Sequence, residues 1–538
     1  MGKSGAKAGQ GSRSSFVRGV GILTASNIIV KITGLLFKIP MNHIVGDAGM
    51  GYYNSAYSVY TMFYMLSTSG LPVALSVMIS GKRASGEVRC AKTVFRAALC
   101  MFALLGLLSS AAMFFFSEEF AAVIGSPSSS ASVVSAAPAI FFICLSSAYK
   151  GYFQGCGYMT PIAVSQILES AGKLIFGILG ALYASSKGLP IQTVAAYAVL
   201  GLSLGSFLSI LCLVLTGLKR GDRDLVLPDV GVSYNTCGAG AAAAELIKIS
   251  LPVTLSASVM TLTNTLDTFL IQRILCLRGL SEESAAAVYG NYTTLAVPMF
   301  NLPPVLVYPV AFALVPIVAA EREKHGAVSD LVRARIEKSF SYAVMIGLPC
   351  AAGLSVLSGP ILNLLYRASS AEAAAPLLTL LAPSSCLVCI LAVTNSVLQG
   401  CGRESMPVIS MLAGAAVKCA SGIFLIKAYG IGGAPVSTLF CYITVTAMNM
   451  YFVARYTSAV PKPAVLVKPI AATTASAFSA YAVYGILSGR CALDGKISCL
   501  IAILAACAVY FIPMKNEILR ITDGKLDFGK RKKIKSEE

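Results

Sequence analysis

Basic residues within the first apolar segment of this chain could bind an anion. In the stretch SNIIVKITGLLFKIPM, Lys31 and Lys38 are seven residues apart, which is nearly two helical turns, and Asn27 precedes Lys31 by four residues. The three side chains therefore share one face of a helix. Because a lysine ammonium binds phosphate as a point charge, this face suits a pyrophosphate. Lys38 is near the end of the segment, and its alternative role is to extend to the membrane surface.

Other charges lie inside later apolar segments, where a charge is costly and therefore suggests a function. Glu169 and Lys173 are four residues apart, which allows either a structural ion pair or a contact with a ligand. Lys418 has no acidic residue four positions before or after it, so we expect its partner on another helix. Asp267 is the candidate partner, and Arg273 competes for the same carboxylate.

These residues form two candidate sets. The candidate substrate-binding residues are Asn27, Lys31, Lys38, Lys173, Arg273 and Lys418. The candidate residues for ion coupling or charge pairing are Glu169 and Asp267. Lys150 lies near the boundary of its apolar segment, where we expect its ammonium to reach water.

Apolar segments long enough to cross a membrane must position these residues. The 538 residues are 56% hydrophobic and 12% charged, with a mean hydropathy of +0.76. Apolar runs of about 20 residues recur, and each can cross about 30 Å of hydrocarbon as a helix. We therefore predict an all-α polytopic membrane protein with about fourteen transmembrane helices.

The distribution of Lys and Arg predicts the orientation of these helices. Basic residues are far more frequent in the connections on one side of the predicted spans than on the other. By the positive-inside rule the basic side is cytosolic, which places both termini there and predicts a multi-pass protein of the bacterial cytoplasmic membrane. Most of the net charge of +18 then serves topology and contact with anionic lipid, so we expect no nucleic-acid partner.

An internal repeat indicates that the chain has two related halves. The tetrapeptide QGCG occurs at Gln154–Gly157 and again at Gln399–Gly402, an offset of 245 residues, and Lys173 and Lys418 have the same offset. An earlier pair of segments matches at an offset of 237 residues. Parallel repeats related by an axis along the membrane normal are typical of transporters, with the substrate bound between the halves.

The repeat predicts two parallel six-helix lobes followed by two C-terminal helices. The predicted parts are a cytosolic segment at 1–16, an N-lobe at 17–217, a cytosolic linker at 218–244, a C-lobe at 245–454, two further spans within 455–514 and a basic cytosolic tail at 515–538. Each QGCG falls in a short turn between two spans of its lobe. The glycines of these turns, Gly155, Gly157, Gly400 and Gly402, suit tight turn or hinge geometry better than substrate contact.

Proline marks a second candidate hinge. Pro303 and Pro304 are two of five prolines in one predicted span, and no straight helix would keep all of them. We expect a broken helix next to a cavity, although a permanent kink without gating is equally compatible with these residues.

Enzymatic chemistry has few candidate residues. The two histidines, His43 and His325, lie in separate predicted loops, and the chain has no phosphate-binding GxxxxGK[ST] motif. Cys386 and Cys389 form a CxxC pair inside an apolar run, where cysteine packs as a small hydrophobe, whereas a structural zinc needs four ligands. We therefore predict no enzymatic activity, no metal and no cofactor.

Several motifs together resemble one family of transporters. The run KITGLLFKIP at 31–40, the following GDAGMGYYN at 46–54 and the QGCG turns are similar to the stage V sporulation protein B group. That group belongs with the MurJ-like lipid II flippases and polysaccharide exporters of the multidrug/oligosaccharidyl-lipid/polysaccharide flippase superfamily. The resemblance covers nearly the whole chain.

The resemblance implies a function and a set of positions. It implies flipping of undecaprenyl-pyrophosphate-linked saccharides by alternating access, with Lys31 and Gly34 matching a basic-x-x-Gly pattern of the first span. It also implies a cation site with carboxylates from spans seven and eleven. Asp267 matches the first, but span eleven carries Lys418 where the second would stand, which argues against a sodium site here. The two trailing spans resemble a pair that forms a groove for the lipid tail.

Three functional hypotheses remain from the sequence. The first is a flippase for a lipid-linked oligosaccharide, above all the peptidoglycan precursor lipid II, with coupling to the membrane potential, H⁺ or Na⁺ left open. Its partners would be that lipid, the surrounding membrane lipids and, as a further option, cell-wall synthesis proteins. The alternative is a MATE-type drug/cation antiporter that uses a buried carboxylate such as Asp267 or Glu169. A scaffold for cell-wall assembly without transport is the third.

Overall fold

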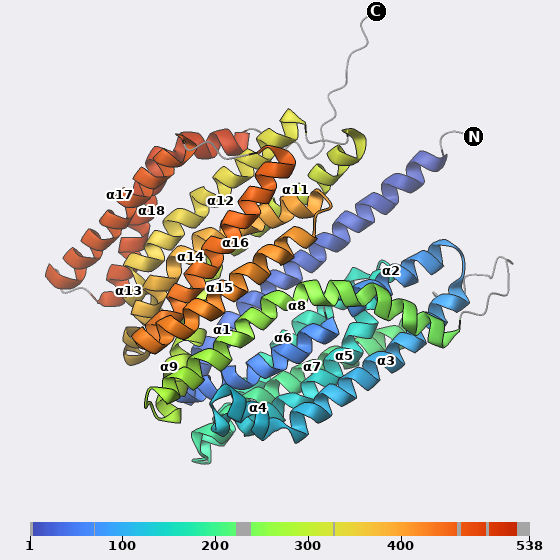
Figure 1. The fold of residues 1–538 in the computed structure, drawn as a ribbon, viewed down its shortest axis with the longest axis horizontal. Coiled ribbons are helices and arrows are strands. Elements are labelled where there is room, and N and C mark those ends of the chain that lie inside the picture. The colour runs from blue at the N-terminus through green and yellow to red at the C-terminus, as the bar shows by residue number, and fades with distance from the viewer. Residues whose placement is uncertain are drawn as a thin grey trace, which may run out of the picture. The chain divides into compact units, whose positions relative to one another are not determined.

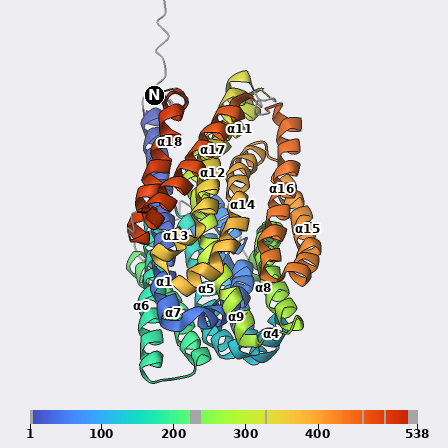
Figure 2. The ribbon, with the colours of Figure 1, turned by 90° about the vertical axis from the view of Figure 1, so that its left-hand side faces the viewer.

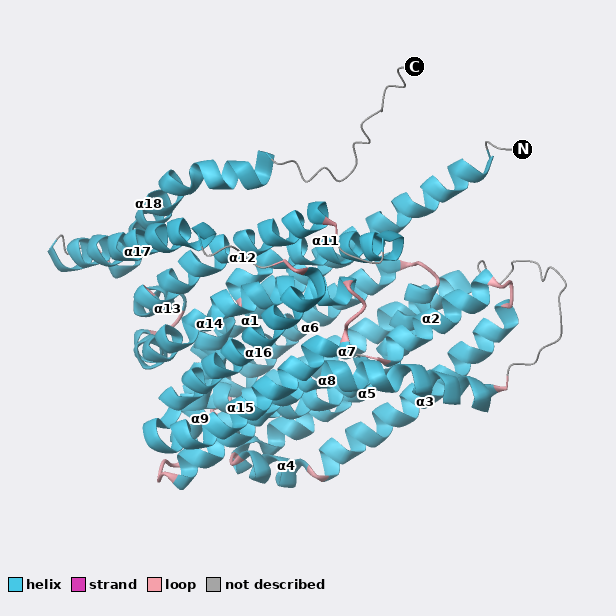
Figure 3. Ribbon diagram, turned by 45° about the horizontal axis from the view of Figure 1, so that its top comes forward, coloured by secondary structure: helices cyan, strands magenta, loops and turns pink. Residues whose placement is uncertain are grey.

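The chain folds into helices joined by short connections. The structure is a computed structural model that describes residues 4–68, 70–221, 238–325, 329–459, 464–490 and 494–523. Within these ranges there are helices and loops but no strands (Figure 3). The described residues contain 11 segments long and apolar enough to cross a membrane, one of which, Ser405–Thr457, includes two helices. The prediction of an all-α polytopic membrane protein is therefore confirmed.

The described residues group into two compact units, and the first comprises Met1–Thr294. Its helices are α1 (Ser4–Thr68), α2 (Leu71–Ala84), α3 (Val88–Phe115), α4 (Ser117–Ile124), η1 (Pro127–Ser129), α5 (Ser130–Gly155), α6 (Met159–Ser186), α7 (Ile191–Gly221), α8 (Ala239–Leu277) and α9 (Glu282–Asn291), followed by the π-helical η2 (Tyr292–Ala296), in which the unit ends (Figure 1). Helices α8 and α9 are part of this unit because both pack on α1. The expected lobe boundaries come from the sequence repeat, whereas these units are defined by the packing of helices on each other. The lobe boundaries therefore stay a prediction.

The second unit comprises Leu295–Glu538. Its helices are α10 (Val297–Phe300), α11 (Leu302–His325), α12 (Asp330–Val356), α13 (Ser358–Leu365), α14 (Ala368–Gly400), α15 (Ser405–Tyr429), η3 (Gly430–Gly432), α16 (Gly433–Thr457), α17 (Ala464–Gly485), η4 (Ile486–Arg490) and α18 (Gly495–Asp523). Helices α15 and α16 lie side by side, as do α17 and α18 (Figure 2). The linker expected at 218–244 and the tail expected at 515–538 fall largely outside the described residues.

Glycine shapes the long first helix. At Gly46 the backbone of α1 has φ 72° and ψ −177°, a combination that residues with a side chain rarely adopt. Beyond this kink, Gly51 lies directly against the backbone of Ala286 in α9, and Gly290 of α9 lies against the carbonyl of Asp47. A methyl group at Gly51 or Gly290 would push the two helices apart, so these glycines hold the second half of α1 close to α9.

The two QGCG motifs form the same turn. In the first, the amide of Gly157 donates to the Gln154 carbonyl at 3.0 Å and that of Tyr158 to the Phe153 carbonyl at 2.8 Å. This is the pattern of a Schellman helix end, and Gly157 has the positive φ of 80° that it requires. The second copy repeats these contacts, and its Gly402 has φ 64°.

The first glycine of each motif packs in an equivalent way. A methyl group at Gly155 would meet Ile79 and the carbonyl of Ser76 in α2, each at 2.8 Å. A methyl group at Gly400 would meet Val318 at 2.8 Å and the Val315 carbonyl of α11 at 2.9 Å. Each unit therefore uses the motif both to end one helix and to seat it on another. These contacts give the glycines a structural role, while a hinge motion stays a prediction.

The CxxC pair takes part in close helix packing. A methyl group at Gly347 of α12 would lie 3.0 Å from the Cα of Cys386 and 3.1 Å from the Cβ of Cys389. Gly106 of α3 faces Cys144 of α5 in the same manner, since a methyl group there would lie 2.8 Å from the cysteine Cβ. All three cysteines occupy positions of small apolar residues between helices, which agrees with the interpretation from the sequence.

The proline-rich span is broken, as expected. Where the sequence predicted one span, the chain forms α9, the π-helical η2, the short α10 and then α11, with Asn301 in a turn between the last two. Pro303 and Pro304 lie in the first turn of α11, where proline is favoured because the amide has no helical partner there. They start a helix after the break, and their role as a hinge stays a prediction.

Candidate functional site

The basic residues of α1 have different environments. Asn27 and Lys31 are exposed, whereas Lys38 is partly buried and its ammonium donates to the carbonyl of Thr293 at 2.9 Å. Thr293 belongs to η2, and π-helical turns are frequent at functional sites. Lys38 therefore has a backbone acceptor in the same unit.

Lys173 lies among aromatic rings. Its ammonium is 4.4 Å from the ring centroid of Tyr57, 5.2 Å from that of Phe37 and 5.7 Å from that of Tyr53, all on α1. The rings also pack on each other, with Phe37 and Tyr53 5.4 Å apart and Tyr53 and Tyr57 stacked at 6.1 Å. We call these three rings the aromatic box. Such rings stabilise an ammonium by cation–π attraction but leave its positive charge intact.

Two ammonium groups share this region. The ammonium of Lys173 lies 5.2 Å from the ring centroid of Phe37, and Lys38 is the next residue of α1. Keeping two like charges together in a largely buried place is unfavourable unless an anion compensates for them. The hydroxyl of Tyr53 adds a possible donor, since this side chain is 2% exposed and its oxygen has no hydrogen-bond partner among the described residues.

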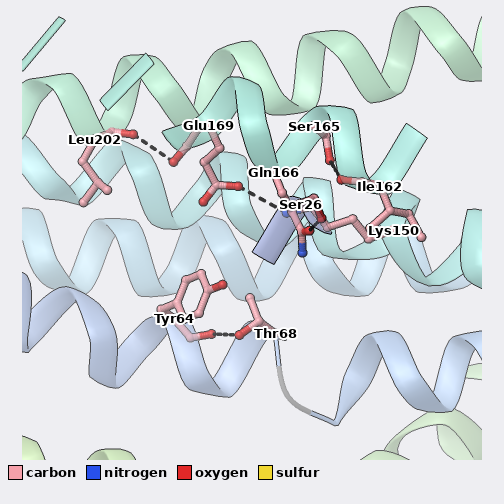
Figure 4. Close-up of polar contacts among 10 residues, drawn as sticks. Ser26, Tyr64, Thr68, Lys150, Ile162, Ser165, Gln166, Glu169 and Leu202 are labelled. Carbon is pink, nitrogen blue, oxygen red and sulfur yellow. Dashed lines mark hydrogen bonds and ion pairs between the residues drawn. The ribbon is translucent and has the colours of Figure 1, made fainter. Parts of the chain in front are cut away.

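Glu169 forms its ion pair with a lysine of another helix. Its carboxylate accepts a hydrogen bond from Lys150 of α5 at 3.2 Å (Figure 4), and the two side chains are 19% and 17% exposed. Lys150 therefore has an acceptor on α6 within its range, and the contact of its ammonium with water stays a prediction. Lys173, one turn further along α6, directs its ammonium over the aromatic box.

Glycines determine where Glu169 and Lys173 are held. The stretch Gly201–Gly205 of α7 is a GxxxG motif, which lets two membrane helices approach closely. A methyl group at Gly205 would lie 2.5 Å from the carbonyl oxygen of Glu169 and 2.8 Å from the amide of Lys173. Gly201 lies in the same way against the backbone of Gly177. The turn of α6 that carries both charges therefore rests directly on the backbone of α7.

Hydrogen bonds between largely buried side chains join α1 to α8, α9 and η2. Tyr289 and Thr268 share a hydrogen bond of 2.7 Å, and Thr268 shares another of 2.7 Å with Ser58 of α1. Gln272 donates to Ser55 at 2.8 Å, and Asn54 donates to Thr294 at 2.7 Å.

Near the kink, Asp47 accepts from Asn42 at 3.1 Å and from Asn291 at 3.2 Å. These bonds fix the part of α1 that carries Tyr53 and Tyr57.

The remaining candidate residues lie elsewhere. In unit 1, Asp267 is partly buried and Arg273 is exposed, both on α8. In unit 2, Lys418 of α15 is 5% exposed, with Gly414 and Gly422 one turn before and after it. The pairing of Asp267 with Lys418 stays a prediction.

The sequence reasoning missed the aromatic box and the role of Lys150. A signal for the box was present, because Tyr53, Tyr57, Tyr60 and Tyr64 recur at helical spacing and so share one face of α1. Their rings do form a continuous row, with centroid distances of 6.1, 5.5 and 5.7 Å. No spacing in the sequence pointed to Lys150 as the partner of Glu169, since the two lie on different helices.

A polytopic helical bundle with charged groups held inside its spans is the architecture of a membrane transporter. The model of the polysaccharide biosynthesis protein family matches residues 16–321, more than half of the chain. The chain belongs to this family.

Two relatives agree with this assignment. The chain is 25% identical over 462 residues to the lipid II flippase MurJ of Bacillus subtilis, covering 82% of this chain and 83% of the relative. It is 24% identical over 452 residues to stage V sporulation protein B of the same organism, covering 82% and 84%. The resemblance to the stage V sporulation protein B and MurJ-like group is therefore confirmed.

Two solved structures show the fold. A structure of the lipid II flippase MurJ in an inward closed conformation matches with a TM-score of 0.71 at 14% identity, covering 93% of this chain and 99% of that one. An inward-facing multidrug resistance MATE family transporter matches with a TM-score of 0.58 at 16% identity, covering 80% and 98%.

Proposed function

We propose that this protein is a flippase that moves an undecaprenyl-pyrophosphate-linked saccharide, lipid II in particular, across the cytoplasmic membrane by alternating access. The observation that carries the proposal is the ammonium of Lys173 over the rings of Tyr57 and Phe37, with a second basic residue, Lys38, directly after Phe37 on α1. A pyrophosphate brings several anionic oxygens, which can accept from both lysines at once. The name of one relative, the lipid II flippase MurJ, supports the same substrate class.

The proposed mechanism assigns a step to each part of the site. Lys31, exposed on α1, first attracts the anionic headgroup, and Lys38 and Lys173 then hold its pyrophosphate. The polyprenyl tail stays in the lipid while the headgroup crosses. With the termini cytosolic, an anion moving outward gains about 2.3 kcal/mol per charge for each 100 mV of membrane potential, which supplies a driving force without a coupling ion.

The bound lipid provides the most direct test of the substrate. We expect native mass spectrometry of the protein, released from its own membranes in mild detergent, to reveal a bound species with the mass of an undecaprenyl-pyrophosphate-linked saccharide. A Lys38→Met/Lys173→Met variant should retain phospholipids and lose this species, because the charges that hold the pyrophosphate are gone. Phospholipids as the sole bound species in the wild-type protein would contradict the proposal.

A MATE-type antiporter is the second candidate function. Glu169 and Asp267 are carboxylates within helices of unit 1, and the MATE fold matches this chain. Under our proposal, vesicles containing the wild-type protein should not expel ethidium when an inward H⁺ or Na⁺ gradient is imposed. Gradient-dependent ethidium efflux that is lost in Asp267→Asn would favour the antiporter instead.

A further inference from the structure

Three charges on neighbouring helices are arranged so that one lysine neutralises the acid and the other does not. Glu169 and Lys173 are four residues apart on α6, a spacing at which the two side chains can pair. The carboxylate of Glu169 instead accepts from Lys150 of α5 at 3.2 Å. The ammonium of Lys173 lies 4.4 Å from the ring of Tyr57.

We propose that Lys150 is a positioning residue that keeps Lys173 available to an anionic ligand by holding Glu169 away from it. This inference rests on the proposed function, because it assumes that Lys173 receives the pyrophosphate. It assigns no contact with the ligand to Lys150 itself. The ammonium of Lys150 pairs with the carboxylate of Glu169, which would otherwise compete with the ligand for Lys173.

The physical reason is the cost of an uncompensated carboxylate within the membrane. Without the Lys150 ammonium, the carboxylate of Glu169 would be a largely buried anion and would turn to the nearest cation. Lys173 already interacts electrostatically with Glu169 and is the cation on the same helix. The phenols of Tyr57, Tyr60 and Tyr64 on α1 also interact with Glu169, and they supply no positive charge.

Rotation of α6 cannot change the partner of Glu169. Gly205 of α7 rests on the backbone at both Glu169 and Lys173, so α6 has little room to rotate. Only the side chains can change partners. The presence or absence of a cation at position 150 then decides whether Glu169 forms an ion pair with Lys173.

Equilibrium binding of undecaprenyl pyrophosphate to the full-length protein in phosphatidylcholine nanodiscs tests this role. We expect Lys150→Met to weaken binding about tenfold, as for the loss of one charge-assisted contact. Adding Glu169→Gln to Lys150→Met should restore the affinity to within about threefold of wild type, because no carboxylate is left to compete. Lys150→Arg, which keeps the pair, should bind as wild type does.

A matched control separates this effect from a simple loss of positive charge. Lys82 and Glu87 form an exposed ion pair of 2.9 Å at the end of α2, and Lys82→Met removes the same charge there. We expect that variant to bind as wild type does. Glu169→Gln alone should also leave the affinity nearly unchanged, whereas an effect of net charge would make it bind more tightly.

The outcomes distinguish this inference from the function on which it rests. A Lys150→Met variant that binds the probe as wild type does would overturn the inference alone. A double variant that stays as weak as Lys150→Met would also overturn it, because Lys150 would then act through packing. A wild-type protein that does not bind the probe, or binds it equally after Lys173→Met, would overturn the function and the inference together.

Discussion

Replacing Lys173 by methionine should abolish the ability of this protein to sustain growth of a strain depleted of its lipid II flippase. Methionine has a similar length and is apolar, so it can remain over the ring of Tyr57 and leave the packing of α1 on α6 intact. What it lacks is the charge that compensates a pyrophosphate. We expect binding of the lipid-linked substrate to fall by about two orders of magnitude, the combined effect of two charge-assisted contacts.

Lys187, at the end of the helix that carries Lys173, offers a matched control for Lys173→Met. It follows the C-terminus of α6, is exposed, and also lies near an aromatic ring, with its ammonium 6.0 Å from the ring centroid of Tyr183. Lys187→Met removes the same charge from the same kind of neighbour outside the site, and it should support normal growth. Full growth with Lys173→Met at normal membrane levels of protein would remove Lys173 from the mechanism.

Replacing Gly205 by alanine should destabilise the protein clearly. The added methyl group would lie 2.5 Å from the carbonyl oxygen of Glu169 and 2.8 Å from the amide of Lys173, so α6 and α7 must separate. Forcing atoms into such a close contact costs about 1–3 kcal/mol, and further van der Waals contact along the two helices is lost as they move apart. We expect a clear drop in the thermal unfolding midpoint of the detergent-solubilised protein and reduced transport, because both charges move.

A second glycine on a helix of the same unit provides the comparison. Gly81 lies inside α2, where an added methyl group would have no atom within 4 Å, and its φ is not positive. Gly81→Ala should be neutral or stabilise the protein by up to about 1 kcal/mol, because alanine is the better helix former. Equal unfolding midpoints for Gly205→Ala and Gly81→Ala would show that the contact between α6 and α7 is not tight.

The interior of the site was partly predictable from local spacing. Helical periodicity placed Glu169 and Lys173 on one face, and the same rule would have placed the tyrosines of the aromatic box on one face of α1. The rule describes one helix at a time. It cannot predict that the face with Lys173 packs on the face with Tyr57. It also cannot predict that the partner of Glu169 is Lys150, which lies on a third helix.

For Lys38 too, the sequence position did not predict the contact that the side chain makes in the folded chain. From its position near the end of an apolar run, extension to the membrane surface was a reasonable alternative. In the folded chain its ammonium donates to the Thr293 carbonyl, 255 residues away in sequence. A contact of this range depends on how the segment that follows α9 passes α1, which hydropathy does not describe.

By itself, the sequence determined the helical membrane class, the two equivalent QGCG turns and the family, because apolar length, repeated motifs and turn glycines are properties of consecutive residues. The Schellman turns at Gly157 and Gly402 belong to this group, since a positive φ next to a helix end is a local requirement. Only the tertiary structure decided which cation neutralises Glu169 and which rings surround Lys173. Those choices depend on distances between different helices, and the glycines of α6 and α7 contribute by letting the turn of α6 that carries Glu169 and Lys173 rest on the backbone of α7.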